Sequence, residues 1–482
     1  MGKEKTPSFV FEMELRLNPY EKKIVRKKMD IGRRIYNACL GEALKRLHKV
    51  QADKKYRALL KEPKSRKRNA RLKEIERGYE YSEYDLHDWV KFCNHHFKDQ
   101  IGAPEAQKLA SRAFDAVEKV HYRKAKRVYF KGPDEFISIE NKKNDCGLRW
   151  KDGQILWGKL ALDVWPLKKK DDYGRDALKA RTKYVRILCK VIRGQERFFV
   201  QLVQEGFPPV KEDCVIGQAD ARVGIDPGTT TMAIVSKEAV HLVELAPDLH
   251  EDERRIRRIQ RAMDRSRRAT NPQNYNEDGT VKKGAKVWVK SNRYRKMAEQ
   301  RKETGRKLAA KRKQSHERLA NEVVALGLDV RVEDMAYQGL QKRAKKTTRN
   351  HKNGKINKKK RFGKTLANRA PAMFLVILDR KLKNHGSQLK KVKTFSVKAS
   401  QLNHKTGAFV KKQLNERWND IDGHKVQRDL YSAFLIANTN ERLTAVDCAL
   451  AGQWYEHFLI LHDAEVNRIK TSGNKTMKWY VA

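Results

Sequence analysis

Apolar and polar residues alternate at the start of the chain, over residues 9–17. Every second residue is apolar, which places five side chains on one face: Phe9, Phe11, Met13, Leu15 and Leu17. This pattern predicts a half-buried strand that ends at Asn18-Pro19. From about residue 20 to 128 the pattern becomes helical and highly charged. It indicates a helical module lying along a nucleic-acid backbone, although solvated surface helices have the same pattern.

Strand patterns return between residues 135 and 203. Residues 150–157 contain the hairpin signal Asp152-Gly153, and residues 185–192 and 198–203 flank Arg193-Gly194 as a second hairpin. The simplest arrangement of these strands with the first one is a small β-barrel, with the helices inserted between its strands.

The second half alternates strands with helices. Residues 223–235 read as a strand, a turn at Pro227-Gly228 and a second strand. Basic helices are predicted over residues 250–268 and 291–326, a mixed helix over 366–382 and a strand over 391–397. Residues 341–364 are too charged and too poor in apolar residues to fold alone, so we expect them to order on a phosphate backbone or to remain a tether. The alternation favours a mixed α/β nuclease fold.

Composition limits the partners of this chain. Its 482 residues include 108 Lys and Arg against 59 Asp and Glu, a formal net charge of +49. That length predicts about two to four domains, and that charge favours a polyanionic partner, for which nucleic acid is the best candidate. No apolar run approaches the length needed to cross a membrane, and no signal peptide is recognised. We therefore expect a location in the cytosol or nucleoid.

Cysteine use agrees with a reducing compartment, because the six cysteines are scattered and form no Cys-x-x-Cys pair. His87, Cys93, His95 and His96 are the closest approach to a zinc cluster in the sequence. Their spacing matches no ordinary ligand pair, and helices tolerate exposed histidines, so zinc binding here is the weaker interpretation.

Three carboxylates stand where predicted elements begin or end. Asp226 lies at the bend after the first strand of residues 223–235, and Glu333 follows a short β-branched run. Asp429 lies in the first turn of a helix beginning near Gln427. Each position has an ordinary explanation, as a surface turn, a solvated strand end or a charge favoured by the helix dipole. Together they can converge as the oxygen ligands of two Mg²⁺ or Mn²⁺ ions that assist phosphodiester cleavage.

The motifs around these residues resemble those of a known family. Gly-Ile-Asp-Pro-Gly at Asp226, Val-Glu-Asp-Met at Glu333 and Gln-Arg-Asp-Leu-Tyr-Ser-Ala at Asp429 are similar, in this order, to the motifs of a RuvC-type nuclease domain. The version here resembles transposon-encoded TnpB nucleases and the compact type V CRISPR effectors. The resemblance implies an RNase H-like fold with Asp226, Glu333 and Asp429 as catalytic metal ligands.

The family layout implies a division of this chain. It assigns residues 1–19 and 131–219 to a β-barrel wedge domain, 20–130 to an inserted helical recognition domain and 220–482 to the RuvC-like nuclease domain. Within the nuclease domain, residues 398–426 resemble the family's zinc ribbon, with Thr406-Gly407 and Asp422-Gly423 in its frame but without cysteines. Neutral Asn and Thr cannot replace thiolates, so structural zinc is not expected.

Three functions remain open at this point. The leading one is an RNA-guided DNA endonuclease that binds a guide RNA, recognises a short flanking DNA motif and uses one site to cut double-stranded target DNA, as a monomer or dimer on one RNA. The second is a guide-directed DNA-binding repressor without cleavage, and the third is an RNA-independent, structure-specific nuclease. Intact acidic positions argue against the second, and the large basic first half argues against the third.

Overall fold

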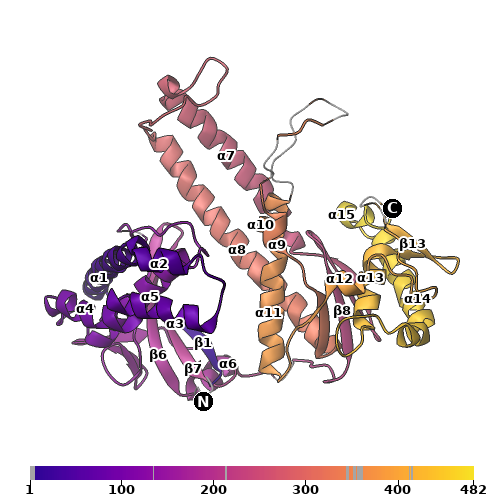
Figure 1. Ribbon diagram of the computed structural model, residues 1–482, viewed down its shortest axis with the longest axis horizontal. Helices are drawn as coiled ribbons and strands as arrows, with labels where there is room; N and C mark the ends of the chain where they lie inside the picture. Colours follow the sequence, from indigo (N-terminus) through magenta and orange to yellow (C-terminus); the bar gives the residue numbers. More distant parts are fainter. Residues whose placement is uncertain are drawn as a thin grey trace. The chain divides into compact units, whose positions relative to one another are not determined.

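The computed structural model describes residues 6–133, 135–211, 214–343, 347–350, 354, 362–411, 413 and 416–482 (Figure 1). The chain is mixed α and β and divides into two compact units, Met1–Lys211 and Glu212–Ala482. Most of segment 341–364, predicted to order on a phosphate backbone or to remain a tether, lies outside the described residues. Within the described ranges, no helix is long and apolar enough to cross a membrane.

The first unit contains a seven-stranded sheet in the order β2-β6-β7-β1-β5-β4-β3. Its first strand, β1 (Ser8–Arg16), buries alternate residues as predicted, and Phe9, Phe11, Met13 and Leu15 enter the core. Both hairpins are confirmed: β3 (Arg149–Lys151) pairs with β4 (Gln154–Trp157), and β6 (Thr182–Ile192) pairs with β7 (Gln195–Glu205). The two central residues of each turn have positive φ, as a type I′ turn requires.

The predicted closed β-barrel is wrong, because the sheet is open. Its edge strands, β2 (Ser138–Glu140) and β3, have three residues each, and no pairing joins them in the described chain. Strand β1 pairs with β7 along most of its length but reaches β5 (Leu160–Val164) only at Leu15 and Arg16. The sheet curls enough for β3 to approach β6. Closure needs continuous pairing around a barrel, which edge strands of this length do not supply.

Six helices of the first unit are described: α1 (Pro19–Ala52), α2 (Lys54–Leu59), α3 (Arg66–Gly78), α4 (Glu83–His95), α5 (Ala103–His121) and α6 (Asp172–Lys179). α1 starts at a capping box in which Asn18 and Glu21 each bond the other's backbone amide at 2.9 Å. Its buried face packs on α5, and both join the sheet in one continuous apolar core.

The second unit is built on a five-stranded sheet of order β10-β9-β8-β11-β12. These strands are β10 (Val240–Glu244), β9 (Thr231–Ser236), β8 (Arg222–Pro227), β11 (Asp329–Glu333) and β12 (Lys390–Val392). β8, β11 and β12 run parallel, whereas β9 and β10 are antiparallel to their neighbours.

Helices cover both faces of this sheet. α8 (Asn292–Leu326) and α11 (Pro371–Asn384) pack on one face, and α13 (Arg428–Ala437) and α14 (Cys448–Thr471) pack on the other. This explains why every residue of β9 is buried. Met232 and Ile234 enter the core beneath α8 and α11, while Ala233 and Val235 enter the core beneath α13 and α14. The prediction that Phe374, Ile377 and Leu378 point inward is confirmed, because all three lie in the core between α8, α11 and the sheet.

Smaller elements complete this unit. α7 (His250–Thr270) lies beside α8 as a long hairpin (Figure 1). The others are η1 (Pro247–Leu249), η2 (Pro272–Asn274), α9 (Tyr337–Leu340), α10 (Gly363–Arg369), α12 (Thr394–Val397), β13 (Trp418–Ile421), β14 (His424–Gln427) and α15 (Lys475–Lys478).

Two sequence predictions in this region are wrong in part. The helix predicted over 366–382 is broken at Ala370, whose φ is +47°. Pro371 follows directly, and right-handed helical backbone is disfavoured at a residue that precedes proline. The strand predicted over 391–397 ends at Val392, and α12 follows.

A close contact between α13 and β8 sets the geometry of the second unit. A Cβ atom on Gly224 would lie 2.0 Å from the Ala433 carbonyl oxygen and 2.5 Å from the Ala437 amide nitrogen. The backbones of helix and strand therefore touch at Gly224, where any side chain would separate them. This contact fixes how closely the start of α13 approaches the end of β8.

We predict that Gly224→Ala destabilises the chain by about 3 kcal/mol or more, since the added methyl group meets backbone that cannot move alone. The measurement is the urea midpoint of the full chain. Gly452→Ala is the matched control, because a Cβ at this exposed position of α14 meets nothing within 4 Å. We expect that control to be neutral or to stabilise the chain by up to about 1 kcal/mol. Equal midpoints for Gly224→Ala and wild type would contradict the close contact.

Candidate active site

The parallel pairing of β8 with β11 brings Asp226 and Glu333 to one edge of the sheet. Val223 pairs with Val330, and Ile225 with Val332. All four of these valine and isoleucine side chains lie in the core beneath α8 and α11. Because strand side chains alternate between faces, Asp226 and Glu333 face the opposite side, which α13 covers.

Asp429 reaches the same region from the first turn of α13. The helix begins at Arg428, and its N-cap Gln427 accepts a hydrogen bond from the Leu430 amide at 2.8 Å. A carboxylate in a first helical turn is favoured by the helix dipole. The contact at Gly224 holds α13 on β8, so Asp429 lies over the strand that carries Asp226.

The three carboxylates are close enough to interact. Burial raises the pKa of Asp226 well above its usual value, and the negative charges of Asp429 and Glu333 raise it further. The Arg428 guanidinium and the Ser432 hydroxyl oppose this increase. Burial also raises the pKa of Glu333, against a smaller opposite effect of the Thr394 hydroxyl. Such repulsion between carboxylates is relieved by a bound cation.

Two arginines lie against Asp429. Arg428 Nη2 is 3.2 Å from Asp429 Oδ1, and Arg417 Nη1 is 3.7 Å from Oδ2. The Arg417 guanidinium also stacks on the rings of Trp479 and Tyr480, 4.3 and 4.9 Å from their centres. Arginines on aromatic faces are held by cation–π attraction. The chain thus places positive charge where a metal ion at Asp429 would need to enter.

Tyr337 is a site residue that the sequence does not reveal. It begins α9, four residues after Glu333, and its buried hydroxyl has no hydrogen-bond partner among the described residues. Burial raises the pKa of Tyr337, and the negative charges of Asp226 and Glu333 raise it further. Nothing in the local sequence distinguishes this tyrosine from an ordinary turn aromatic.

The donor chemistry fits a hard divalent cation. Three carboxylates supply only oxygen ligands, which Mg²⁺ and Mn²⁺ prefer. In the described part of the chain, however, no three His, Cys, Asp or Glu side chains are gathered tightly enough to hold one ion. Asp226, Glu333 and Asp429 interact without converging as ligands, and Asp429 pairs with two arginines instead. The same finding applies to His87, Cys93, His95 and His96.

Residues 398–426, predicted from the sequence to resemble a zinc ribbon, contain two turns with hydrogen bonds. Asn403 Oδ1 accepts the Lys405 amide at 3.0 Å, and the β13–β14 hairpin turns through Asp422 and Gly423, both with positive φ. His404 is buried, with Nδ1 2.7 Å from the Tyr431 hydroxyl. Residues 412, 414 and 415 of this segment lie outside the described residues.

Two solved structures that align with this chain are distant from it in sequence. No protein-family model matches the chain, and no curated protein matches its sequence. A cryo-EM structure of the Cas12f1–sgRNA–target DNA complex aligns with a TM-score of 0.44 and 13% identity, covering 91% of this chain and 99% of that chain. A cryo-EM structure of a CRISPR-Cas12f ternary complex aligns with a TM-score of 0.25 and 12% identity, covering 88% and 86%. Both TM-scores are too low to establish a shared fold.

We predict that Asp226→Asn stabilises the metal-free chain at neutral pH by about 1 kcal/mol or more. Because the pKa of Asp226 is raised, the folded chain binds more protons than the unfolded chain between the usual pKa and the raised one. Wild-type stability therefore falls as pH rises through that window, and the variant loses this dependence. Urea unfolding in EDTA at acidic and neutral pH measures the stability of wild type and variant and the pH dependence of each. Exposed Asp220→Asn is the control, and a destabilised Asp226→Asn at neutral pH would contradict the repulsion.

We further predict that Arg417→Gln tightens Mn²⁺ binding by about two- to fivefold, since its guanidinium competes with a cation for Asp429. Titration of free Mn²⁺ by electron paramagnetic resonance measures the affinity without any cleavage reaction. Arg442→Gln, at an exposed position, is the matched control and should leave the affinity unchanged. Weaker Mn²⁺ binding by Arg417→Gln would mean that the arginine supports the site rather than competing for it.

Proposed function

We propose that this chain is an RNA-guided DNA endonuclease that hydrolyses phosphodiester bonds in one active site formed by Asp226, Glu333 and Asp429. The observation that carries the proposal is the placement of Asp226 and Glu333 at adjacent parallel strand ends, with Asp429 in the first turn of the helix that packs on the same strands. Three carboxylates from widely separated motifs interact at two adjacent strand ends and a helix start. Maintaining such repulsion opposes folding, so a cation-binding role explains it better than a structural role does.

In this proposal Asp226, Glu333 and Asp429 would hold two Mg²⁺ or Mn²⁺ ions, which would supply positive charge for phosphodiester hydrolysis. Arg417 and Arg428, which pair with Asp429 here, would neutralise a phosphate beside the site. The Tyr337 hydroxyl, which has no hydrogen-bond partner among the described residues, is available to donate a hydrogen bond at the same place.

The proposed partners are a guide RNA and double-stranded target DNA with a short flanking motif. The net charge of +49 and the resemblance to TnpB and compact type V effectors support them. The Cas12f1 complex also contains an sgRNA and target DNA, but that structure is too distant from this chain to carry the proposal. Residues 1–19 and 131–219 would form the wedge domain, 20–130 the recognition domain and 220–482 the nuclease domain. The protein would act in the prokaryotic cytosol or nucleoid.

Cleavage distinguishes this proposal from a guide-directed repressor and from an RNA-independent nuclease. We predict that Asp226→Ala, Glu333→Gln and Asp429→Ala each lower cutting by about a thousandfold or more, and that the triple variant is little worse, because the three residues act as one unit. RNA-directed DNA binding should persist in all of them. The assay measures cleavage and gel shift on one matched and one mismatched target, with and without the RNA that co-purifies.

Asp334→Asn is the matched control for this experiment. Asp334 adjoins Glu333 but is exposed and pairs with Lys391 at 2.9 Å, so its loss should leave cutting unchanged. A site variant that cuts like wild type would remove that residue from the site. Wild type that cuts both targets equally without RNA would establish the structure-specific nuclease instead, and guided binding without any cutting would establish the repressor.

A further inference from the structure

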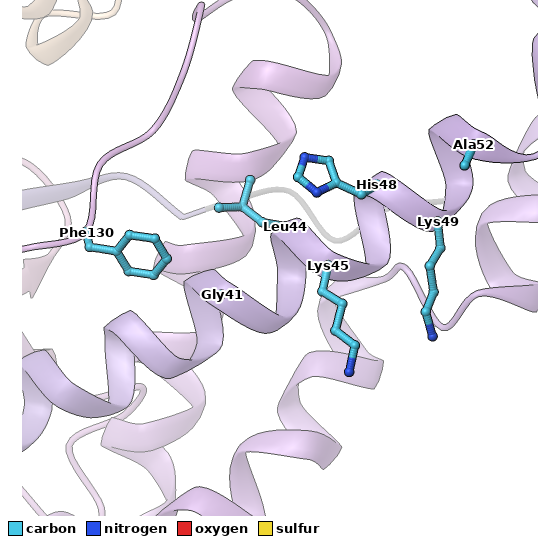
Figure 2. A pocket seen from close by; sticks show the side chains of 7 residues that line it. All are labelled: Gly41, Leu44, Lys45, His48, Lys49, Ala52 and Phe130. Atoms are coloured by element: carbon cyan, nitrogen blue, oxygen red, sulfur yellow. The ribbon is translucent and has the colours of Figure 1, made fainter.

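A groove of about 540 Å³ lies along the surface of α1, in the first unit (Figure 2). Gly41 and Leu44 form part of its apolar lining, and the Phe130 ring stands at one end and points toward Leu44. Lys45 and Lys49 extend from the same stretch of α1. The groove therefore combines an apolar floor, an aromatic ring and neighbouring positive charge.

Phe130 is held at the surface by the segment that carries it. Its side chain is 57% exposed. The adjacent Lys131 is fixed to α1 by Asn37, whose Nδ2 donates to the Lys131 carbonyl at 2.9 Å and whose Oδ1 accepts the Lys131 amide at 2.8 Å. Arg33 Nη1 donates to the same carbonyl at 3.2 Å. Two adjacent aromatic side chains, Tyr129 and Phe130, are thus held exposed beside the groove.

The space beside the ring depends on Gly41. A Cβ atom at this position would lie 3.8 Å from the Phe130 ring, which is ordinary contact, and a larger side chain would extend into the groove. Glycine in the middle of a helix lowers stability by about 1 kcal/mol relative to alanine. Its presence in α1 keeps the groove open next to the exposed ring.

Cationic residues flank two adjacent aromatic residues in the segment beside the groove. Residues 126–131 read Lys-Arg-Val-Tyr-Phe-Lys, and Tyr129 is 60% exposed with the Arg127 guanidinium 4.7 Å from its ring centre. The nearby carboxylate of Glu42 is engaged by Arg46 at 2.9 Å, with Lys45 3.9 Å away. Aromatic rings that stack bases and cations that contact phosphates are the usual components of single-strand binding surfaces.

We propose that this groove binds an unpaired nucleotide of RNA, with the base stacked on Phe130 and the flanking phosphates next to Lys45 and Lys49. RNA is the occupant that fits, since its loops and ends present unstacked bases to exposed aromatic rings. The inference rests on the proposed function in that it names how a guide RNA is held in the first unit. The residues of this groove are far in sequence from Asp226, Glu333 and Asp429.

Photocrosslinking locates the base. The full chain, stripped of co-purified nucleic acid, is irradiated with hexauridylate containing 5-iodouridine, in EDTA and at a salt concentration above physiological. We expect a covalent adduct on the peptide containing Tyr129 and Phe130. Unlabelled hexauridylate should suppress the adduct, whereas inorganic tripolyphosphate and an acidic peptide should not. Suppression by tripolyphosphate at equal phosphate concentration would mean a simple anion site, and equal suppression by hexadeoxythymidylate would overturn the assignment to RNA.

Two variants test the aromatic ring and the space beside it. Phe130→Ala should weaken hexauridylate binding about tenfold, and Phe130→Trp should retain it, because a base stacks on either aromatic ring. Gly41→Leu should weaken binding similarly by filling the groove, while favouring the helix, so misfolding does not explain its effect. Phe92→Ala is the matched control, since Phe92 is a 77% exposed phenylalanine on α4. Unchanged binding in both Phe130→Ala and Gly41→Leu would overturn the site.

The lysines have a separate readout. Lys45→Gln combined with Lys49→Gln should reduce the slope of log affinity against log salt by about 1.4, whereas Phe130→Ala should leave the slope unchanged. An unchanged slope in the double variant would remove the phosphate contacts from the site. All these measurements exclude divalent metal, so they are independent of cleavage. Loss of the adduct with intact guided cutting would overturn this inference alone, and an adduct without cutting by wild type would overturn the proposed nuclease alone.

Discussion

The contact between α13 and β8 is the constraint on which the candidate active site depends. Gly224 has no side chain, and the backbone of α13 occupies the place where one would lie. This brings the first turn of α13, with Asp429, over the strand that carries Asp226. The parallel pairing of β8 with β11 then adds Glu333 at the same sheet edge. One missing side chain and one strand pairing therefore bring together three carboxylates that are distant in sequence.

Electrostatic repulsion acts between the three carboxylates in this arrangement. Burial and neighbouring negative charges raise the pKa of Asp226, so full ionisation of the three carboxylates is unfavourable in this arrangement. Arg428 and Arg417 offset part of that charge at Asp429, and Trp479 and Tyr480 keep Arg417 in position. The same principle acts over the whole chain, where an excess of positive charge favours association with a polyanion. The proposed cations at the three carboxylates and the proposed nucleic acid on the basic surface would each neutralise an excess of charge, of opposite sign in the two places.

Local patterns in the sequence predicted the elements better than their assembly. The alternation in β1 and the turns at Asp152-Gly153 and Arg193-Gly194 have local causes, and each was predictable. The break at Ala370 was also predictable from Pro371, but the apolar periodicity across it masked the signal. Whether the first sheet closes depends on the lengths of β2 and β3 and on where β1 changes partners, which no local pattern records. Asp226, Glu333 and Asp429 could be selected as candidates from their motifs, whereas Tyr337 and Arg417 join them only through folding.

Anomalous diffraction from crystals of the full chain soaked in Mn²⁺ tests the central claim most directly. The account predicts two peaks in contact with the carboxylates of Asp226, Glu333 and Asp429, with the Arg417 guanidinium moved away from Asp429. It also predicts that both peaks weaken or disappear in crystals of Asp226→Asn. Mn²⁺ bound only elsewhere on the chain, with Arg417 and Arg428 still against Asp429, would contradict the account.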